Sequence, residues 1–224
     1  MSGQSATTSA RRGFLVRLAG GVAALAAGWS ITHAEPIRAA APLPGADDPD
    51  AWTARITGKH RQVVDAVSPN SGFAAAYAAN FADGYKTTHN LTDRDITPVI
   101  VFRHMAMPLA LQDAVWAKYH IGELLQVNDP KTSAPATRNI FRDSIALHPG
   151  LTYEQMMRSG TIILACNLAL SVFSSMAAPK AGVEPDEAKK EWQAGLIPGV
   201  VLVPSGVYAV SRAQERECTY CFGG

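Results

Sequence analysis

Short apolar runs alternate with longer segments of helical periodicity between residues 60 and 222. The apolar runs are rich in Val and Ile, and two are almost unbroken, as in strands that are covered on both faces. We predict strands at RQVVDAV (61–67), TPVIVF (97–102), TIILAC (161–166), GVVLVP (199–204) and CTYCF (218–222). Helices are predicted between them, at residues 72–85, 108–125, 167–177, 184–195 and 206–217.

The alternation of strand and helix indicates a parallel sheet. Helix start signals support it, because Pro185 stands where a first-turn proline belongs and Ser205 can cap the last helix. Strand–helix–strand units connect by right-handed crossovers, which place helices on both faces of the sheet. The predicted fold is therefore a three-layer α/β/α sandwich with a parallel sheet of about five strands, formed by residues 59–224.

One segment interrupts this alternation. Residues 126–150 contain three prolines and little periodicity, and the segment is longer than a plain connection in a compact domain. We interpret it as an insertion that is either a lid or a solvated loop.

The N-terminal segment has the pattern of an export signal. Arg11 and Arg12 precede Phe14 and a weakly apolar stretch of Ala and Gly, which resembles a twin-arginine signal covering residues 1–34. A retained membrane anchor is the alternative, but the apolar run is short and glycine-rich for a span. We expect a flexible leader at residues 35–58 and a periplasmic protein that is not stably inserted in the membrane after removal of the signal.

Composition narrows the class of protein. The chain has 224 residues, of which 47% are hydrophobic and 17% charged, enough for one sizeable core. The predicted signal holds three of the 20 basic residues and no acidic one, so the remainder has 17 basic and 19 acidic residues. A chain so nearly neutral gives no electrostatic reason to expect a nucleic acid as partner.

Polar residues follow the predicted strands at one edge of the sheet. In open parallel sheets, ligands bind outside the carboxyl ends of the strands, where helix N-termini also point. These ends carry Ser68 and Asn70, then Arg103 and His104, then Cys166 and Asn167, then Ser205 and Gly206.

Cys166 is the candidate nucleophile at this edge. It closes a buried strand at the entrance to a helix, where the positive end of the helix dipole favours the thiolate; the alternative is a cysteine that packs as a small apolar residue. His104 can accept a proton from the thiol or hydrogen-bond an anion, or serve as a structural hydrogen-bonding group. Met105 and Met107 are soft copper ligands, but two methionines at a helix entry are usually core, and we predict no metal and no cofactor.

Cys218 and Cys221 form a CxxC motif, whose spacing serves redox enzymes, metal sites and structure alike. In a strand their Cα atoms are about 10 Å apart and their side chains leave opposite faces, whereas a disulfide needs less than about 7 Å. A strand therefore predicts cysteines that pack or face a partner. A frayed strand leaves a terminal disulfide open, and redox or metal chemistry is the third alternative. Because the three cysteines would reach an oxidising compartment, their odd number leaves at least one thiol without an intramolecular partner.

Three stretches together resemble the DsrE/DsrF-like family: TPVIVFRHMAMPLALQDAVWAKY, TIILACNLAL and IPGVVLVPSGVYAVSRAQERECTYCF. The likeness covers roughly residues 60–222. It implies a parallel α/β/α sandwich, a sulfur relay in which a cysteine at the position of Cys166 carries a persulfide, transfer of that sulfur to a partner protein, and assembly as homo- or hetero-oligomers.

The leading hypothesis is an exported DsrE-like protein that handles a small sulfur species or a partner thiol, with Cys166 as the sulfur acceptor and His104 as its proton partner or anion donor. The residues expected to bind the ligand are Arg103, Asn167, Ser205 and Gly206. The alternatives are a non-catalytic ligand-binding or assembly module on the same fold, and a thiol redox or metal-binding protein that uses Cys218 and Cys221.

Overall fold

The computed structural model describes residues 48–224, and the predicted signal and residues 35–47 of the predicted leader lie outside this range. Five strands form one parallel sheet in the order β4-β3-β2-β1-β5. All five predicted strands are confirmed, at β1 (His60–Ala66), β2 (Ile96–Phe102), β3 (Ile162–Cys166), β4 (Val201–Val203) and β5 (Thr219–Phe222).

Two of the three internal strands explain the unbroken apolar runs. Every residue of β2 and β3 is buried, because helices or loops cover both faces of the sheet at these strands. The strands at the two edges, β4 and β5, are short and partly exposed. The most apolar segments of the sequence therefore lie at the centre of the sheet.

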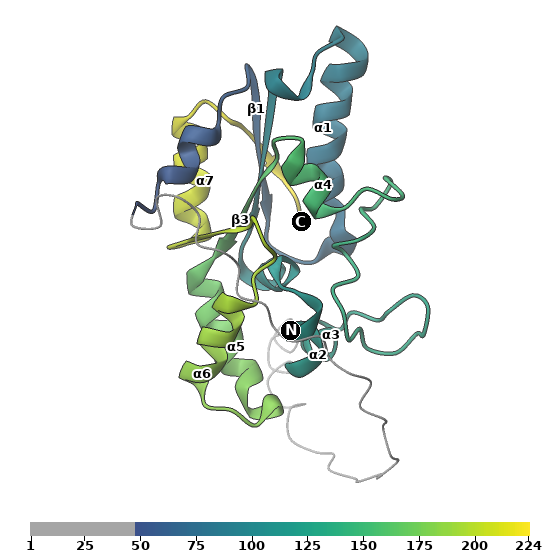
Figure 1. Ribbon diagram of the computed structural model, residues 1–224, viewed down its shortest axis with the longest axis vertical. Helices are drawn as coiled ribbons and strands as arrows, with labels where there is room; N and C mark the ends of the chain where they lie inside the picture. Colours follow the sequence, from purple (N-terminus) through teal and green to yellow (C-terminus); the bar gives the residue numbers. More distant parts are fainter. Residues whose placement is uncertain (1–47) are drawn as a thin grey trace, which may run out of the picture. The chain divides into compact units, whose positions relative to one another are not determined.

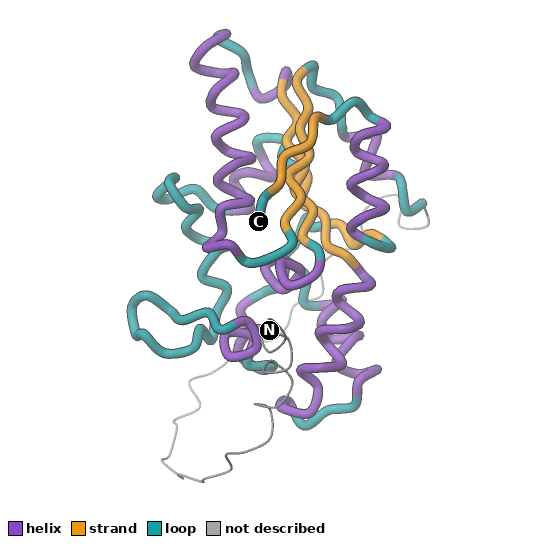
Figure 2. The backbone as a smooth tube through the Cα atoms, turned by 180° about the vertical axis from the view of Figure 1, so that it is seen from behind, coloured by secondary structure: helices purple, strands orange, loops and turns teal. Residues whose placement is uncertain are grey.

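One face of the sheet is covered by α1 (Phe73–His89) and α4 (Tyr153–Arg158), as Figures 1 and 2 show. Alanines on α1 pack on this face, where the strands contribute Val64, Ile100 and Phe102. Small side chains let the helix backbone approach the sheet closely, so this layer is thin and well packed.

The opposite face is covered by α7 (Gly206–Glu215) and the 3-10 helix η1 (Ala51–Arg55). Trp52 is 3% exposed and packs in this layer, and Asp50 accepts hydrogen bonds from Tyr208 Oη (2.8 Å) and Arg212 Nε (3.0 Å). The prediction of a flexible leader up to residue 58 is therefore wrong for residues 50–58, since burial of Trp52 and Ile56 makes this segment part of the domain. With helices on both faces of a parallel sheet, the three-layer α/β/α prediction is confirmed.

Further helices lie beyond the carboxyl ends of the strands, namely η4 (His104–Ala110), α2 (Asp113–Lys118), α3 (Ile121–Leu125), α5 (Asn167–Ala181) and α6 (Pro185–Ala194). The prediction of one helix over residues 108–125 is wrong. Leu111 and Gln112 are extended and His120 is left-handed (φ 51°), which divides the segment into three pieces. Glu191 of α6 accepts hydrogen bonds from Lys118 (2.6 Å) and from Tyr119 Oη (2.8 Å), so contacts between elements fix these short pieces.

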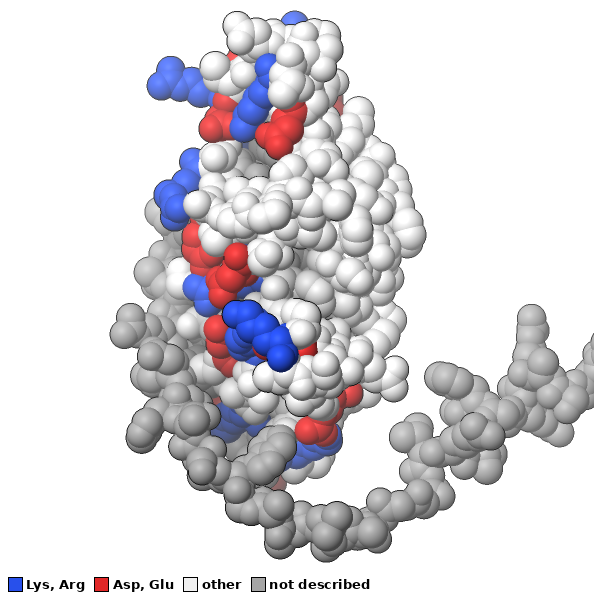
Figure 3. Space-filling view, turned by 90° about the vertical axis from the view of Figure 1, so that its right-hand side faces the viewer, with Lys and Arg blue, Asp and Glu red and all other residues white. Residues whose placement is uncertain are grey.

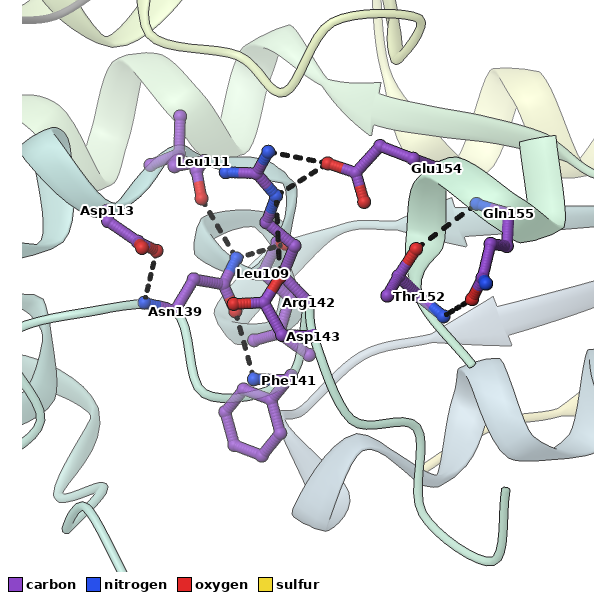
Figure 4. Close-up of polar contacts among 10 residues, drawn as sticks. All are labelled: Leu109, Leu111, Asp113, Asn139, Phe141, Arg142, Asp143, Thr152, Glu154 and Gln155. Atoms are coloured by element: carbon purple, nitrogen blue, oxygen red, sulfur yellow. Dashed lines mark hydrogen bonds and ion pairs between the residues drawn. The ribbon is translucent and has the colours of Figure 1, made fainter. Parts of the chain in front are cut away.

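The insertion at residues 126–150 is anchored to the domain. Asn139 is fully buried, and its Nδ2 donates to the carbonyl oxygens of Leu109 (2.7 Å) and Leu111 (2.8 Å), as Figure 4 shows. Its Oδ1 accepts the N–H of Phe141 (3.2 Å), and Phe141 itself packs in the core of the α1 face. The insertion is thus not a wholly solvated loop, because part of it contributes to the hydrophobic core.

The surface of the domain carries charges of both signs. On the face drawn in Figure 3, basic and acidic side chains lie beside one another, and neither sign covers a broad area. Within residues 48–224, no helix combines the length and the hydropathy required to cross a membrane.

Candidate functional site

Five residues lie at or near the carboxyl ends of the strands, and contacts join four of them, Asp65, Arg103, Gly206 and Tyr220. Asp65 lies in β1, Arg103 follows β2, Cys166 ends β3, Gly206 begins α7, and Tyr220 lies in β5. Alternation along the strands points Asp65, Arg103 and Tyr220 to the same face as Val63 and Val101. Cys166, at the end of β3, packs with the core cluster that includes Ala169 and Leu170 of α5. We call these five residues the Arg103 cluster.

An ion pair organises the Arg103 cluster. Arg103 donates from Nε to Asp65 Oδ1 (2.6 Å) and from Nη2 to Asp65 Oδ2 (2.9 Å), a bidentate arrangement that fixes the plane of the guanidinium. Tyr220 Oη donates to the same carboxylate (3.0 Å). The Asp65 side chain is 4% exposed and that of Arg103 is 26% exposed, so the carboxylate is buried while part of the Arg103 side chain reaches solvent.

Cys166 lies beside this guanidinium and caps a helix. Its Sγ is 3.3 Å from the backbone nitrogen of Ala169, whose N–H it accepts, and it forms the N-cap of α5. The pKa of Arg103 is raised, mainly by its hydrogen bond to Asp65 and in smaller part by the nearby groups of Tyr220 and Cys166. The Cys166 sulfur thus accepts one backbone N–H and lies within electrostatic reach of one cation.

Gly206 lets Arg103 pass under the N-terminus of α7. A Cβ at this position would lie 2.4 Å from Arg103 Cβ and 2.8 Å from its Cδ, so only glycine fits without a shift of the backbone or the arginine. Ser205 caps α7, its Oγ accepting the N–H of Tyr208 (3.2 Å).

Two of the predicted site residues have their contacts elsewhere. His104 is exposed and left-handed (φ 48°), and its ring lies edge-on to Phe173 with 6.1 Å between ring centroids. In the described part of the chain, no hydrogen bond joins it to Cys166. Asn167 accepts a hydrogen bond from Gln193 Nε2 (3.2 Å), which ties α5 to α6. The structure therefore brings Cys166, Arg103 and Gly206 together, whereas His104 and Asn167 contact the helices beyond the sheet.

Asp65 and Tyr220 are the members that the sequence analysis missed. Asp65 stands in the apolar run VVDA at a position that strand alternation makes inward-facing, and a carboxylate there requires a buried partner. An acidic residue in an apolar strand therefore indicates that a buried hydrogen-bonding or charged partner exists, but it does not identify that partner. Only the strand order, which places β1 between β2 and β5, identifies Arg103 and Tyr220.

The CxxC cysteines lie on opposite faces of the sheet. Cys218 packs in the core under α7, whereas Cys221 packs against the core on the α1 face, and both are free thiols. This confirms the strand geometry and shows that the terminal disulfide is not formed. Burial raises the pKa of Cys218 to about 11 and also raises the pKa of Cys221, so both thiols are protonated at neutral pH. Within residues 48–224, no three His, Cys, Asp or Glu side chains gather as metal ligands.

An open cleft of about 810 Å³ lies apart from the Arg103 cluster, between the insertion and the β1–α1 loop. Ser71 of that loop lines it, together with Gln126, Lys131, Arg138 and Phe141 of the insertion. None of its lining residues belongs to the Arg103 cluster, so the insertion does not form a lid over Cys166 in this structure.

Comparison with known proteins leaves the family and the function open. No family model matches the chain, and neither does any curated protein. Among solved structures, a protein of unknown function from Methanobacterium thermoautotrophicum is similar at 15% sequence identity, with a TM-score of 0.35, over 73% of this chain and 98% of that one. This degree of similarity assigns no function to the chain.

Proposed function

We propose that the protein accepts a sulfur atom from a small anionic sulfur species onto Cys166, as the resemblance to the DsrE/DsrF-like family implies. The observation that carries the proposal is the position of the Cys166 sulfur, which accepts the Ala169 N–H at the start of α5 and interacts electrostatically with the guanidinium of Arg103. In this assignment Arg103 takes the anion-binding role, which the sequence suggested for His104 as an alternative to that of proton partner.

The chemistry requires no external oxidant when a sulfane sulfur is the donor. With thiosulfate, the Cys166 thiolate forms a bond to the outer sulfur, the sulfur–sulfur bond of thiosulfate breaks, and sulfite leaves with the bonding electron pair. The product is a cysteine persulfide anion. A Cys166 thiol would first release its proton to solvent water, and the guanidinium of Arg103 would stabilise negative charge on both the incoming anion and the persulfide.

The burial of Cys166 limits the size of the donor. Its residue is 5% exposed, so a small inorganic species reaches the sulfur more readily than a bulky disulfide does. We expect thiosulfate or a short polysulfide to react with the folded protein, and glutathione disulfide to react only after unfolding.

Intact-mass spectrometry after incubation with thiosulfate tests the proposal. We expect a gain of one sulfur atom that is absent in Cys166→Ser and retained in Cys218→Ser and Cys221→Ser. Arg103→Lys should slow the gain, because the charge survives but the bidentate contact with Asp65 does not. His104→Gln is the matched control and should leave the rate unchanged. No adduct on folded wild-type protein, or an adduct on another cysteine, refutes the assignment.

A second candidate function, assembly, is favoured by an uncharged surface next to the same site. Leu168, Val172 and Met176 lie four residues apart on α5 and are 62%, 50% and 58% exposed, so they form one apolar stripe. Val207 at the start of α7 is 63% exposed. Residues 167–179 of α5 and 206–211 of α7 contain no Asp, Glu, Lys or Arg, and depletion of charge is the compositional mark of an interface core.

A second copy of this chain is the partner that fits this surface. In a two-fold symmetric dimer the same surface of both copies is in contact. A net charge on that surface would face an equal charge of the same sign, so an uncharged surface favours self-association. We expect a homo-oligomer in analytical ultracentrifugation, and a monomer for Val172→Glu. Thr88→Glu, which adds the same charge to an exposed position of α1, is the control. A monomeric wild type refutes assembly without affecting the thiol chemistry.

Export remains a sequence-based proposal. The pair Arg11 and Arg12 carries it, and replacement of both by Lys keeps the charge but removes the guanidinium groups. We expect the precursor of this variant to stay in the cytoplasm. Unchanged export would indicate the general secretory route.

A further inference from the structure

The cleft between the insertion and the β1–α1 loop has the dimensions of a small-molecule site. Its volume of about 810 Å³ lies in the range of roughly 300–1,000 Å³ that such sites occupy. It is separate from the Arg103 cluster, so a ligand here would be independent of the thiol chemistry proposed above.

The walls of the cleft are fixed before any ligand binds. Within the insertion, the N–H of Ala136 donates to Val127 O (2.9 Å), and Arg138 Nε donates to Asp129 Oδ2 (3.0 Å). These two bonds join residues 127–129 to residues 136–138. On the opposite side, a Cβ at Gly72 would lie 2.9 Å from Phe141 Cδ1, so the β1–α1 loop and the insertion are in close contact. A preformed wall lowers the entropic cost of binding.

The lining combines apolar side chains with hydroxyl groups that have no hydrogen-bond partner among residues 48–224. Val127, Ile140 and Phe141 supply apolar surface, while Ser71 and Ser144 supply hydroxyls that make no hydrogen bond to other residues in the range 48–224. Ser71 is also left-handed (φ 51°), a conformation that costs free energy in a residue other than glycine and that clusters at binding sites. An amphipathic ligand matches this combination.

The charges on the rim select the sign of the ligand. Two basic residues, Lys131 and Arg138, and one acidic residue, Asp143, line the cleft. Arg138 is paired with Asp129, and Asp143 lies 4.0 Å from Arg142. Lys131 is exposed, and its ammonium group lies within ion-pair distance of no carboxylate among residues 48–224, although its charge helps to lower the pKa of Asp129. The rim therefore offers one cation to an incoming anion, while Asp143 opposes a second negative charge.

We propose that this cleft binds a small organic monoanion, an apolar body that carries one carboxylate, and that Lys131 fixes the carboxylate. The apolar body contacts Ile140 and Phe141, and the hydroxyls of Ser71 and Ser144 are within the same cleft to accept or donate further hydrogen bonds.

Titration of the isotope-labelled full chain, followed by amide chemical shifts, tests this proposal with three probes: phenylpropionate, its neutral amide and phenyl phosphate. We expect shifts in the loop after β1 and in the insertion, with phenylpropionate binding about three- to fivefold more tightly than the amide, the ratio expected for an exposed ion pair. Phenyl phosphate, a dianion above its second pKa, should bind more weakly than phenylpropionate. Lys131→Gln should bring the ratio of carboxylate to amide close to one.

The matched control is Lys190→Gln, which removes an exposed lysine from α6 and should preserve the ratio. Both lysines are on the surface, so both variants should fold. The proposal is overturned if no probe shifts the cleft residues, if the shifts lie on the α5 stripe or the Arg103 cluster, or if the amide binds as tightly as the carboxylate to wild type.

Discussion

The ion pair of the Arg103 cluster gives the sharpest test of how the sheet edge is built. Asp65→Asn keeps the shape of the side chain and removes its charge. Breaking a buried ion pair from one side costs about 3–5 kcal/mol, but Arg103 keeps 26% of its side chain exposed, so water compensates part of the loss. We expect the free energy of unfolding to fall by about 2–3 kcal/mol, and the melting temperature to fall by roughly 4–10 °C for a domain of this size.

Removal of the other partner should cost more. Arg103→Met leaves the Asp65 carboxylate, which is 4% exposed, with only the hydroxyl of Tyr220 as hydrogen-bond donor, and we expect a loss of about 3–4 kcal/mol. The double variant Asp65→Asn, Arg103→Met has neither the carboxylate nor the guanidinium, so no buried charge is left without a partner. The two losses should therefore be non-additive, with a coupling free energy of about 2 kcal/mol.

Urea unfolding at pH 7 of the wild type, the two single variants and the double variant measures this coupling. Glu217→Gln is the control, because it breaks the exposed pair with Arg61 (3.2 Å) and should change the stability by less than about 1 kcal/mol. Losses that add to within about 0.5 kcal/mol would refute the reasoning, since Asp65 and Arg103 would then not depend on each other.

Three further variants test the surroundings of the site. Gly206→Ala should lower stability by about 1–2 kcal/mol, because its Cβ would lie 2.4 Å from Arg103 Cβ; a stability equal to wild type in thermal unfolding would show that α7 can shift freely. Asn139→Ala removes three buried hydrogen bonds and should cost about 3 kcal/mol and speed proteolysis within the insertion; resistance equal to wild type would mean that the insertion is held by its apolar contacts. The folded-state pKa of Cys218, about 11 against an ordinary 9.0, predicts a contribution to stability that is complete below about pH 9 and is lost as the pH rises toward 11. Cys218→Ala should therefore show a shallower alkaline fall in urea midpoint than wild type, and an identical slope contradicts the assignment.

Local pattern was sufficient for the strands and for most helices. A strand covered on both faces must be apolar at every position, so Ile96–Phe102 and Ile162–Cys166 could be recognised without knowledge of their neighbours. The same holds for α6 and α7, whose first turns carry Pro185 and the Ser205 cap. Periodicity failed where contacts between elements override propensity, as at Leu111 and His120, which divide residues 104–125 into short pieces.

The candidate site shows the same division between sequence and tertiary structure. The sequence by itself placed Cys166 and Arg103 at strand ends, because the end of an apolar run is a local feature. It left the partners undetermined, since hydrogen bonds between strands depend on strand order, and the order β2-β1-β5 is what joins Arg103, Asp65 and Tyr220. It also left the direction of each side chain undetermined: His104 turns toward Phe173 because its backbone is left-handed, and Cys218 and Cys221 face opposite cores because strand side chains alternate. The sequence thus determined which residues reach the edge of the sheet, and only tertiary packing decided which of them meet.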